Sequence, residues 1–150
     1  MTNTKLPQPY ALRIEMIRAK GYSDQQMIEL IERADADLLK EKVDAEVNWG
    51  AFLQFAGENT AAVRAAVLEG YRFSFITIGG IKSLLSIRFG KEEQRDYRFG
   101  GSWIDGLKLS ASLYEKLRDL VPEHWRMLVE TGADTETVEV RIELAHEIGL

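Results

Sequence analysis

Apolar residues recur at helical spacing through the first 70 positions, in groups separated by residues that begin or end helices. This pattern predicts five short helices. Leu39, Val43 and Val47 extend the third helix at a spacing of i, i+4, i+8. The expected boundary residues are Gly21 after the first helix, Ser23 with its capping-box partner Gln26 before the second, Asp35 or Asp37 before the third, Asn48 before and Gly57 after the fourth, and Asn59 or Thr60 before and Gly70 after the fifth.

The pattern changes after residue 70, where aromatic and β-branched residues alternate over residues 71–78. Such alternation predicts a strand in which Tyr71, Phe73 and Phe75 share one buried face. Two glycines break the strand, and helical spacing then returns as far as Gly90. Essentially no strand is expected before residue 70.

The remainder of the chain mixes strand and helix signals. Residues 96–109 contain glycines that indicate a bent strand or hairpin, and Ser112 with Glu115 predicts a capped helix that ends near Leu120. Residues 124–130 fit either a strand or a helix that begins at Pro122. Strict alternation over residues 137–144 predicts a half-buried strand, so a closing hairpin with a loop at 131–136 is favoured.

These elements predict an α+β fold that is predominantly helical. A layer of short helices over residues 1–70 is followed by a small mixed α/β half with a few strands over residues 71–150. No linker-like composition separates the two parts, so a single domain over 1–150 is expected.

The amino-acid composition indicates a folded globular protein and excludes sites that need cysteine. The chain has 150 residues, 45% of them hydrophobic, and a net charge of −5, which is typical of a folded globular protein. Without cysteine it has no disulfide scaffold, thiolate nucleophile, iron–sulfur cluster or zinc ribbon. The start lacks a signal-peptide core, and no stretch approaches the roughly 18 apolar residues of a membrane span. A cytoplasmic location without a membrane partner is therefore expected.

Charge is unevenly distributed, with sums of −3 over residues 1–70, +3 over 71–120 and −5 over 121–150. In the basic segment 71–108, cations alternate with aromatic residues, as in platforms that bind single-stranded nucleic acid. Alternation along a strand would instead bury the aromatic rings and leave the cations in water. The candidate anion- or nucleic-acid-binding residues are Arg72, Lys82, Arg88, Lys91 and Arg98.

Two further groups of residues are candidates for binding. Gly79, Gly80 and Lys82 follow the expected strand, where a helix N-terminus could bind phosphate or carboxylate; neither a P-loop nor a G-x-G-x-x-G motif is present, and a tight turn explains the glycines equally. An aromatic ridge is formed by Trp49, Phe52 and Phe55. Core packing is the usual role of such a ridge, but aromatic residues also anchor protein interfaces.

No residue pattern predicts catalysis. The two histidines, His124 and His146, lie far apart and form no metal-binding motif, so no catalytic residue, metal or cofactor is assigned. The sequence therefore favours a small intracellular, bacterial-type regulatory or protein-interaction module, with a protein partner or a homo-oligomer. The alternatives are a nucleic-acid-binding regulator that uses residues 71–108 and a small enzyme that acts on an anionic ligand.

Overall fold

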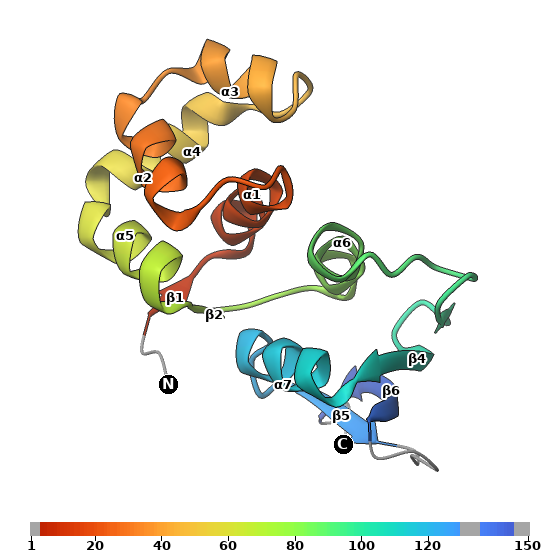
Figure 1. The fold of residues 1–150 in the computed structure, drawn as a ribbon. Coiled ribbons are helices and arrows are strands. Elements are labelled where there is room, and N and C mark those ends of the chain that lie inside the picture. The colour runs from red at the N-terminus through yellow and green to blue at the C-terminus, as the bar shows by residue number, and fades with distance from the viewer. Residues whose placement is uncertain (1–3, 130–135, 146–150) are drawn as a thin grey trace. The chain divides into compact units, whose positions relative to one another are not determined.

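The computed structural model describes residues 4–129 and 136–145. The chain divides into two compact units, Met1–Ser74 and Phe75–Leu150. Helices form most of the first unit and strands lie mostly in the second, as the colours of Figure 1 show, which confirms the predicted α+β class. The expectation that both units belong to one domain stays a prediction.

The first unit contains the five predicted helices and two strands of two residues each, the first of which the sequence does not predict. Its capping residues are largely those that the sequence predicts: Ser23 and Gln26 form both hydrogen bonds of a capping box, and Asp35 and Asn48 each accept a backbone hydrogen bond. The elements are β1 (Lys5–Leu6), α1 (Gln8–Ala19), α2 (Asp24–Arg33), α3 (Ala36–Lys42), α4 (Trp49–Glu58), α5 (Thr60–Glu69) and β2 (Arg72–Phe73).

Two helix ends differ from the prediction. The third helix stops at Lys42, so Val47 lies in the following loop and not on the helix. The fourth helix continues through Gly57 to Glu58. Gly70, in contrast, ends α5 with a φ of 96°, a conformation that glycine adopts without strain.

Apolar side chains from all five helices form the core of the first unit, and the carboxyl group of Glu15 lies among them. Glu15 is 1% exposed and accepts a hydrogen bond of 2.6 Å from the Tyr71 hydroxyl. A buried carboxyl group needs a hydrogen-bond partner, and the Tyr71 hydroxyl provides one. The bond also links α1 to the residue that precedes β2. The fully buried side chains include Leu6, Ile14, Ile17, Met27, Leu39, Trp49, Phe52 and Phe73.

The prediction of a strand over residues 71–78 is mostly wrong. Only Arg72–Phe73 is a strand, paired in parallel with Lys5–Leu6, and the prediction of essentially no earlier strand is wrong at β1. Phe73 is fully buried as expected, but Phe75 is 56% exposed. The strand is short because its partner has two residues, and because Thr77 then caps the next helix by accepting a hydrogen bond from Gly80 N. Gly79 and Gly80 therefore lie within the first turn of that helix.

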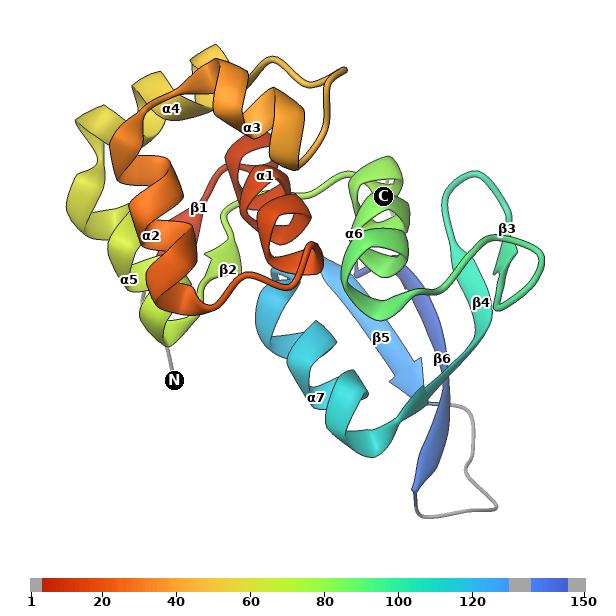
Figure 2. The same cartoon turned by 45° about the horizontal axis from the view of Figure 1, so that its top comes forward.

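The second unit is built around a four-stranded antiparallel sheet with the order β3-β4-β6-β5, and Figure 2 shows β4, β6 and β5 side by side. The predicted hairpin within residues 96–109 is confirmed as β3 and β4, and the ambiguous segment is a strand, as favoured. The predicted loop 131–136 lies almost wholly outside the described residues. The elements are α6 (Ile78–Phe89), β3 (Arg98–Phe99), β4 (Ile104–Ser110), α7 (Ala111–Leu120), β5 (Trp125–Val129) and β6 (Thr137–Leu144).

One face of this sheet is apolar and buried. Helix α7 contacts β4 and β6, and Leu117 of that helix is fully buried. The buried side chains of the sheet face are Ile104, Leu107, Leu109, Trp125, Val140 and Ile142. In the described part of the chain, no helix is long and apolar enough to cross a membrane.

The start of α7 also differs from the prediction. The helix ends at Leu120 as predicted, but its cap is Ser110, whose hydroxyl accepts a hydrogen bond from Leu113 N at 3.2 Å. Ser112 lies in the first turn and is exposed. The sequence offers two serines two positions apart, and β4 extends far enough to make the earlier one the cap.

Replacement of these serines tests the corrected boundary. Ser110→Ala should lower the free energy of unfolding by about 1 kcal/mol, because it removes the cap of α7. Ser112→Ala is the matched control and should change stability by less than about 0.5 kcal/mol, as expected for an exposed helical position. Urea denaturation of both variants measures the difference. A larger loss for Ser112→Ala than for Ser110→Ala would contradict the assignment.

Candidate functional site

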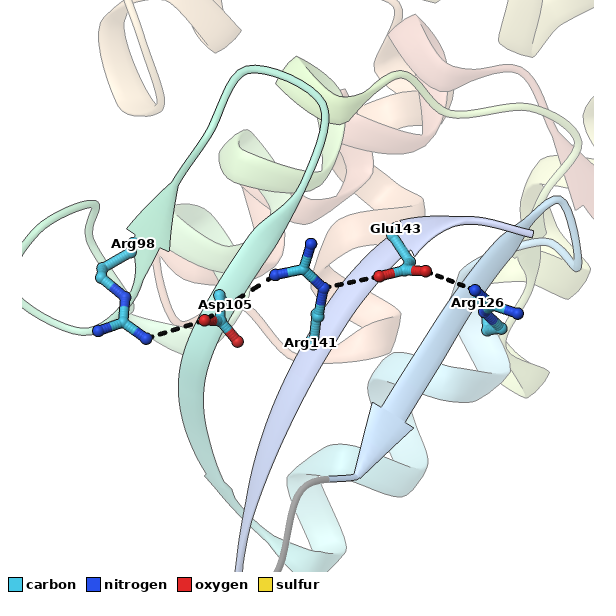
Figure 3. Close-up of polar contacts among 5 residues, drawn as sticks. All are labelled: Arg98, Asp105, Arg126, Arg141 and Glu143. Atoms are coloured by element: carbon cyan, nitrogen blue, oxygen red, sulfur yellow. Dashed lines mark hydrogen bonds and ion pairs between the residues drawn. The ribbon is translucent and has the colours of Figure 1, made fainter. Parts of the chain in front are cut away.

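A row of charged side chains crosses the outer face of the four-stranded sheet. The alternation of β6 that buries Val140 and Ile142 turns Arg141 and Glu143 to the opposite face. Arg98, Asp105, Arg141, Glu143 and Arg126 then follow one another across β3, β4, β6 and β5 with alternating sign, as Figure 3 shows.

Each neighbouring pair in this row is an ion pair. Arg98 meets Asp105 at 2.8 Å, and the same carboxylate lies 3.9 Å from Arg141. Arg141 Nε donates to Glu143 at 2.6 Å, and Arg126 donates to the other oxygen of Glu143. We define these five residues as the charged row. Because every carboxylate lies between two arginines, the row is a connected network in which each ion holds its neighbours in place.

A bulge in β4 places Asp105 in this row. Ile104 pairs with Ile142 and Leu107 with Val140, so Asp105 and Gly106 together lie opposite the single residue Arg141. Gly106 has a φ of 71°, which favours glycine. The extra residue keeps Ile104 and Leu107 on the same buried face while Asp105 reaches Arg141.

Aromatic rings of the basic segment are covered by cations of the protein itself. Lys82 Nζ lies 3.9 Å from the centre of the Phe99 ring, and the Arg141 guanidinium lies 4.8 Å from that of Trp103. Trp103 also packs so closely on Gly100 that a Cβ atom there would lie 2.0 Å from the indole. These contacts occupy ring faces on which a nucleic acid base would stack.

The predicted basic residues belong to both units. Arg72 lies on β2 in the first unit, whereas Lys82, Arg88, Lys91 and Arg98 belong to the second. Lys82 forms an ion pair with Glu93 at 2.7 Å, and Arg98 is held by Asp105.

Two of the predicted residues, Lys91 and Arg98, lie close together in the second unit. Both line an open hollow of about 400 Å³ at the β3–β4 end of the sheet. Three carboxylates share it with four cations, so its charge is nearly balanced. The charged lining residues are Lys91, Arg95, Asp96, Arg98, Asp105, Lys108 and Glu139.

The groups at the predicted anion site already have partners within the protein. Gly80 N donates to the Thr77 hydroxyl at 3.0 Å, and the Lys82 ammonium is paired with Glu93. The role of Gly79, Gly80 and Lys82 in binding an anion stays a prediction.

The aromatic ridge lies mainly inside the first unit. Trp49 is fully buried and Phe52 is 1% exposed, while Phe55 is half-buried and stacks on Tyr10 with ring centres 4.1 Å apart. Of the three, Phe55 alone offers surface that a partner can touch without opening the unit. A role of this ridge in binding stays a prediction.

His124 has a structural position next to β5. Its ring stacks on exposed Phe75, and the Ile76 carbonyl accepts a hydrogen bond of 2.7 Å from Trp125 Nε1. His146 lies outside the described residues. Among the described residues, no group of three or more His, Asp or Glu side chains could hold a metal ion.

The β5 strand is an open edge of the sheet. Its register with β6, together with the bond from Ala145 N to His124 O, means that Arg126 and Leu128 bond to β6. The peptide groups of Met127 and Val129 therefore point away from β6, and within the described residues no backbone group bonds to them. Leu128 and Val129 are 38% and 48% exposed, although apolar.

Arg126, Leu128 and Arg141 are not among the binding residues predicted from the sequence. A signal for them was present, since alternation in residues 125–129 and 137–144 places them on the polar face. Their pairing depends on register, and the open edge depends on strand order.

Comparison of the chain with protein-family models, with curated proteins and with solved structures finds no match.

The two arginines change the titration of Glu143. Its pKa is lowered by the hydrogen bond from Arg126 and then by that from Arg141. Because the folded pKa lies below that of the unfolded chain, the paired carboxylate stabilises the fold above the ordinary pKa, and this contribution is lost as the pH falls through the lowered pKa.

In the Arg126→Gln variant the pKa of Glu143 should therefore rise toward its ordinary value of about 4.3. Carboxyl ¹³C shifts measured against pH report this change. Asp96 is the internal control, because its pKa is lowered chiefly by the hydrogen bond from Arg95 and should not move. An unchanged Glu143 titration would show that Arg126 does not hold this carboxylate in solution.

Proposed function

We propose that this chain is a non-catalytic protein-interaction module that binds its partner along the open edge of β5. The observation that carries the proposal is the combination of unbonded peptide groups with the exposed apolar side chains of Leu128 and Val129. A single exposed leucine is ordinary in a folded protein, but unpaired strand edges are usually protected.

The two edges of this sheet differ in how well they are protected from pairing with a further strand. The β3 edge has two residues, which is too short to template another strand, whereas β5 has five. Proline and bulges, which block strand addition, are absent from β5 and from its pairing with β6. Arg126 is drawn toward Glu143 on the β6 side by its ion pair. These features favour an edge that is kept open for pairing.

Site-specific crosslinking tests this proposal. A photoreactive phenylalanine analogue at position 128 should form a discrete protein adduct in cells of the native host, and the same analogue at Lys116 on exposed α7 should not. An adduct of twice the chain mass would identify a homo-oligomer. Equal crosslinking at both positions, or none at position 128, would contradict the proposal.

The nucleic-acid alternative predicts a different outcome. Its candidate cations are divided between the two units, and at Lys82 and Arg98 they are paired with carboxylates, which reduces the charge available to phosphates. We expect single- and double-stranded oligonucleotides to bind no tighter than about 10⁻⁴ to 10⁻⁶ M at low salt, as measured by fluorescence polarisation. Submicromolar binding at physiological salt that is lost on Arg88→Glu and Lys91→Glu would favour the regulator instead.

A further inference from the structure

The charged row ends at the open edge, and its last member predicts the chemistry of the next strand. From β3 to β5 the signs run positive, negative, positive, negative, positive, and Arg126 occupies the final position. Its side chain is 51% exposed, although it already pairs with Glu143. A guanidinium has five donors, so Arg126 can bind a second carboxylate on its free side.

We infer that the partner binds as an extended peptide that adds a fifth strand beside β5 and places a carboxylate next to Arg126. This inference rests on the proposed function and specifies the ligand of the same edge. Main-chain hydrogen bonds to Met127 and Val129 supply sequence-independent affinity, and the side chains along β5 supply the selectivity.

The register of β5 fixes a pattern for the peptide. In an antiparallel arrangement, the peptide residue that bonds to the Met127 peptide group has its two neighbours opposite Leu128 and Arg126, on the outer face. An apolar side chain fits beside Leu128, which is 38% exposed. The peptide therefore carries an apolar residue followed two positions later by Asp or Glu. Antiparallel pairing is expected because every pair in this sheet is antiparallel.

A second copy of β5 fits this edge less well. If two copies paired about Met127, the two Arg126 side chains would lie diagonal to each other, at about 7–8 Å. Like charges at this spacing repel, whereas an acidic peptide continues the alternation. Charge complementarity thus favours a heterologous acidic strand over self-pairing.

The test uses the full-length protein and three labelled octapeptides that differ at one position each. The parent peptide has β-branched residues around a central Val-Thr-Glu; the second replaces Glu by Lys, and the third replaces the central Thr by Pro, which removes the donor opposite Met127. Fluorescence anisotropy measures affinity, and amide shifts of Met127 and Val129 report where the peptide binds. The wild-type protein should prefer the Glu peptide over the Lys peptide by about fivefold and should not bind the Pro peptide.

Charge reversal at the two ends of the row distinguishes the effect of a charge beside the peptide from the effect of the protein's net charge. Arg126→Glu should invert the preference so that the Lys peptide binds better, whereas Arg126→Gln should abolish the preference without inverting it. Arg98→Glu is the matched control: Arg98 also ends the row in an ion pair, and its reversal changes the net charge equally. It should leave the preference as in the wild type.

Several outcomes would overturn the inference. These are no saturable binding of the Glu peptide, binding of the Pro peptide equal to that of the parent, or a loss of preference in Arg98→Glu as large as in Arg126→Glu. Crosslinking at position 128 without any peptide binding would retain the proposed function and reject the acidic-strand inference alone.

Discussion

The organisation of the second unit depends on the pairing of β6 with strands on both sides. β6 is the strand that joins β5 to the β3–β4 hairpin, and its alternating sequence separates an apolar face from a charged one. Val140 and Ile142 are fully buried on the first face, while Arg141 and Glu143 form the centre of the charged row on the second. A register slip of one residue would exchange the two faces, so core burial and the charged row fix the same register.

In the proposed interaction, the charged row would determine which peptide binds, and it contributes little to the free energy of unfolding. Exposed ion pairs each contribute little, about 0–1 kcal/mol, and Arg98 and Arg126 at the two ends of the row are mostly exposed. What the row does provide is a fixed order of charge across four strands, with Asp105 brought into line by the bulge at Gly106. Strand addition at β5 would extend that order, whereas β3 is too short to do the same.

The sequence predicts local features of this chain well where one residue type determines them. The capping box at Ser23 and Gln26, the strand over residues 137–144 and the end of α7 at Leu120 all follow from short-range chemistry. The failure at residues 71–78 also has a local cause, because the cap formed by Thr77 outweighs aromatic alternation and leaves Phe75 exposed.

The candidate site was not predictable in the same way. Arg126, Arg141 and Asp105 come from three strands, and their contacts require a register and a bulge that no short segment specifies. Strand order likewise decides that β5 is an edge. The sequence pattern of segment 71–108 suggested nucleic-acid binding by its basic and aromatic residues. In the structure, Lys82 and Arg98 contact carboxylates and Phe99 lies under Lys82.

Amide hydrogen exchange at single-residue resolution shows whether β5 presents unbonded peptide groups. The amides of Arg126 and Leu128 bond to β6 and should be protected, whereas those of Met127 and Val129 point to the open side and should exchange rapidly. Alternation of slow and fast exchange along the strand is the predicted result. Equal protection of all four amides in the protein alone would show that the edge is covered and that β5 is not open for strand addition.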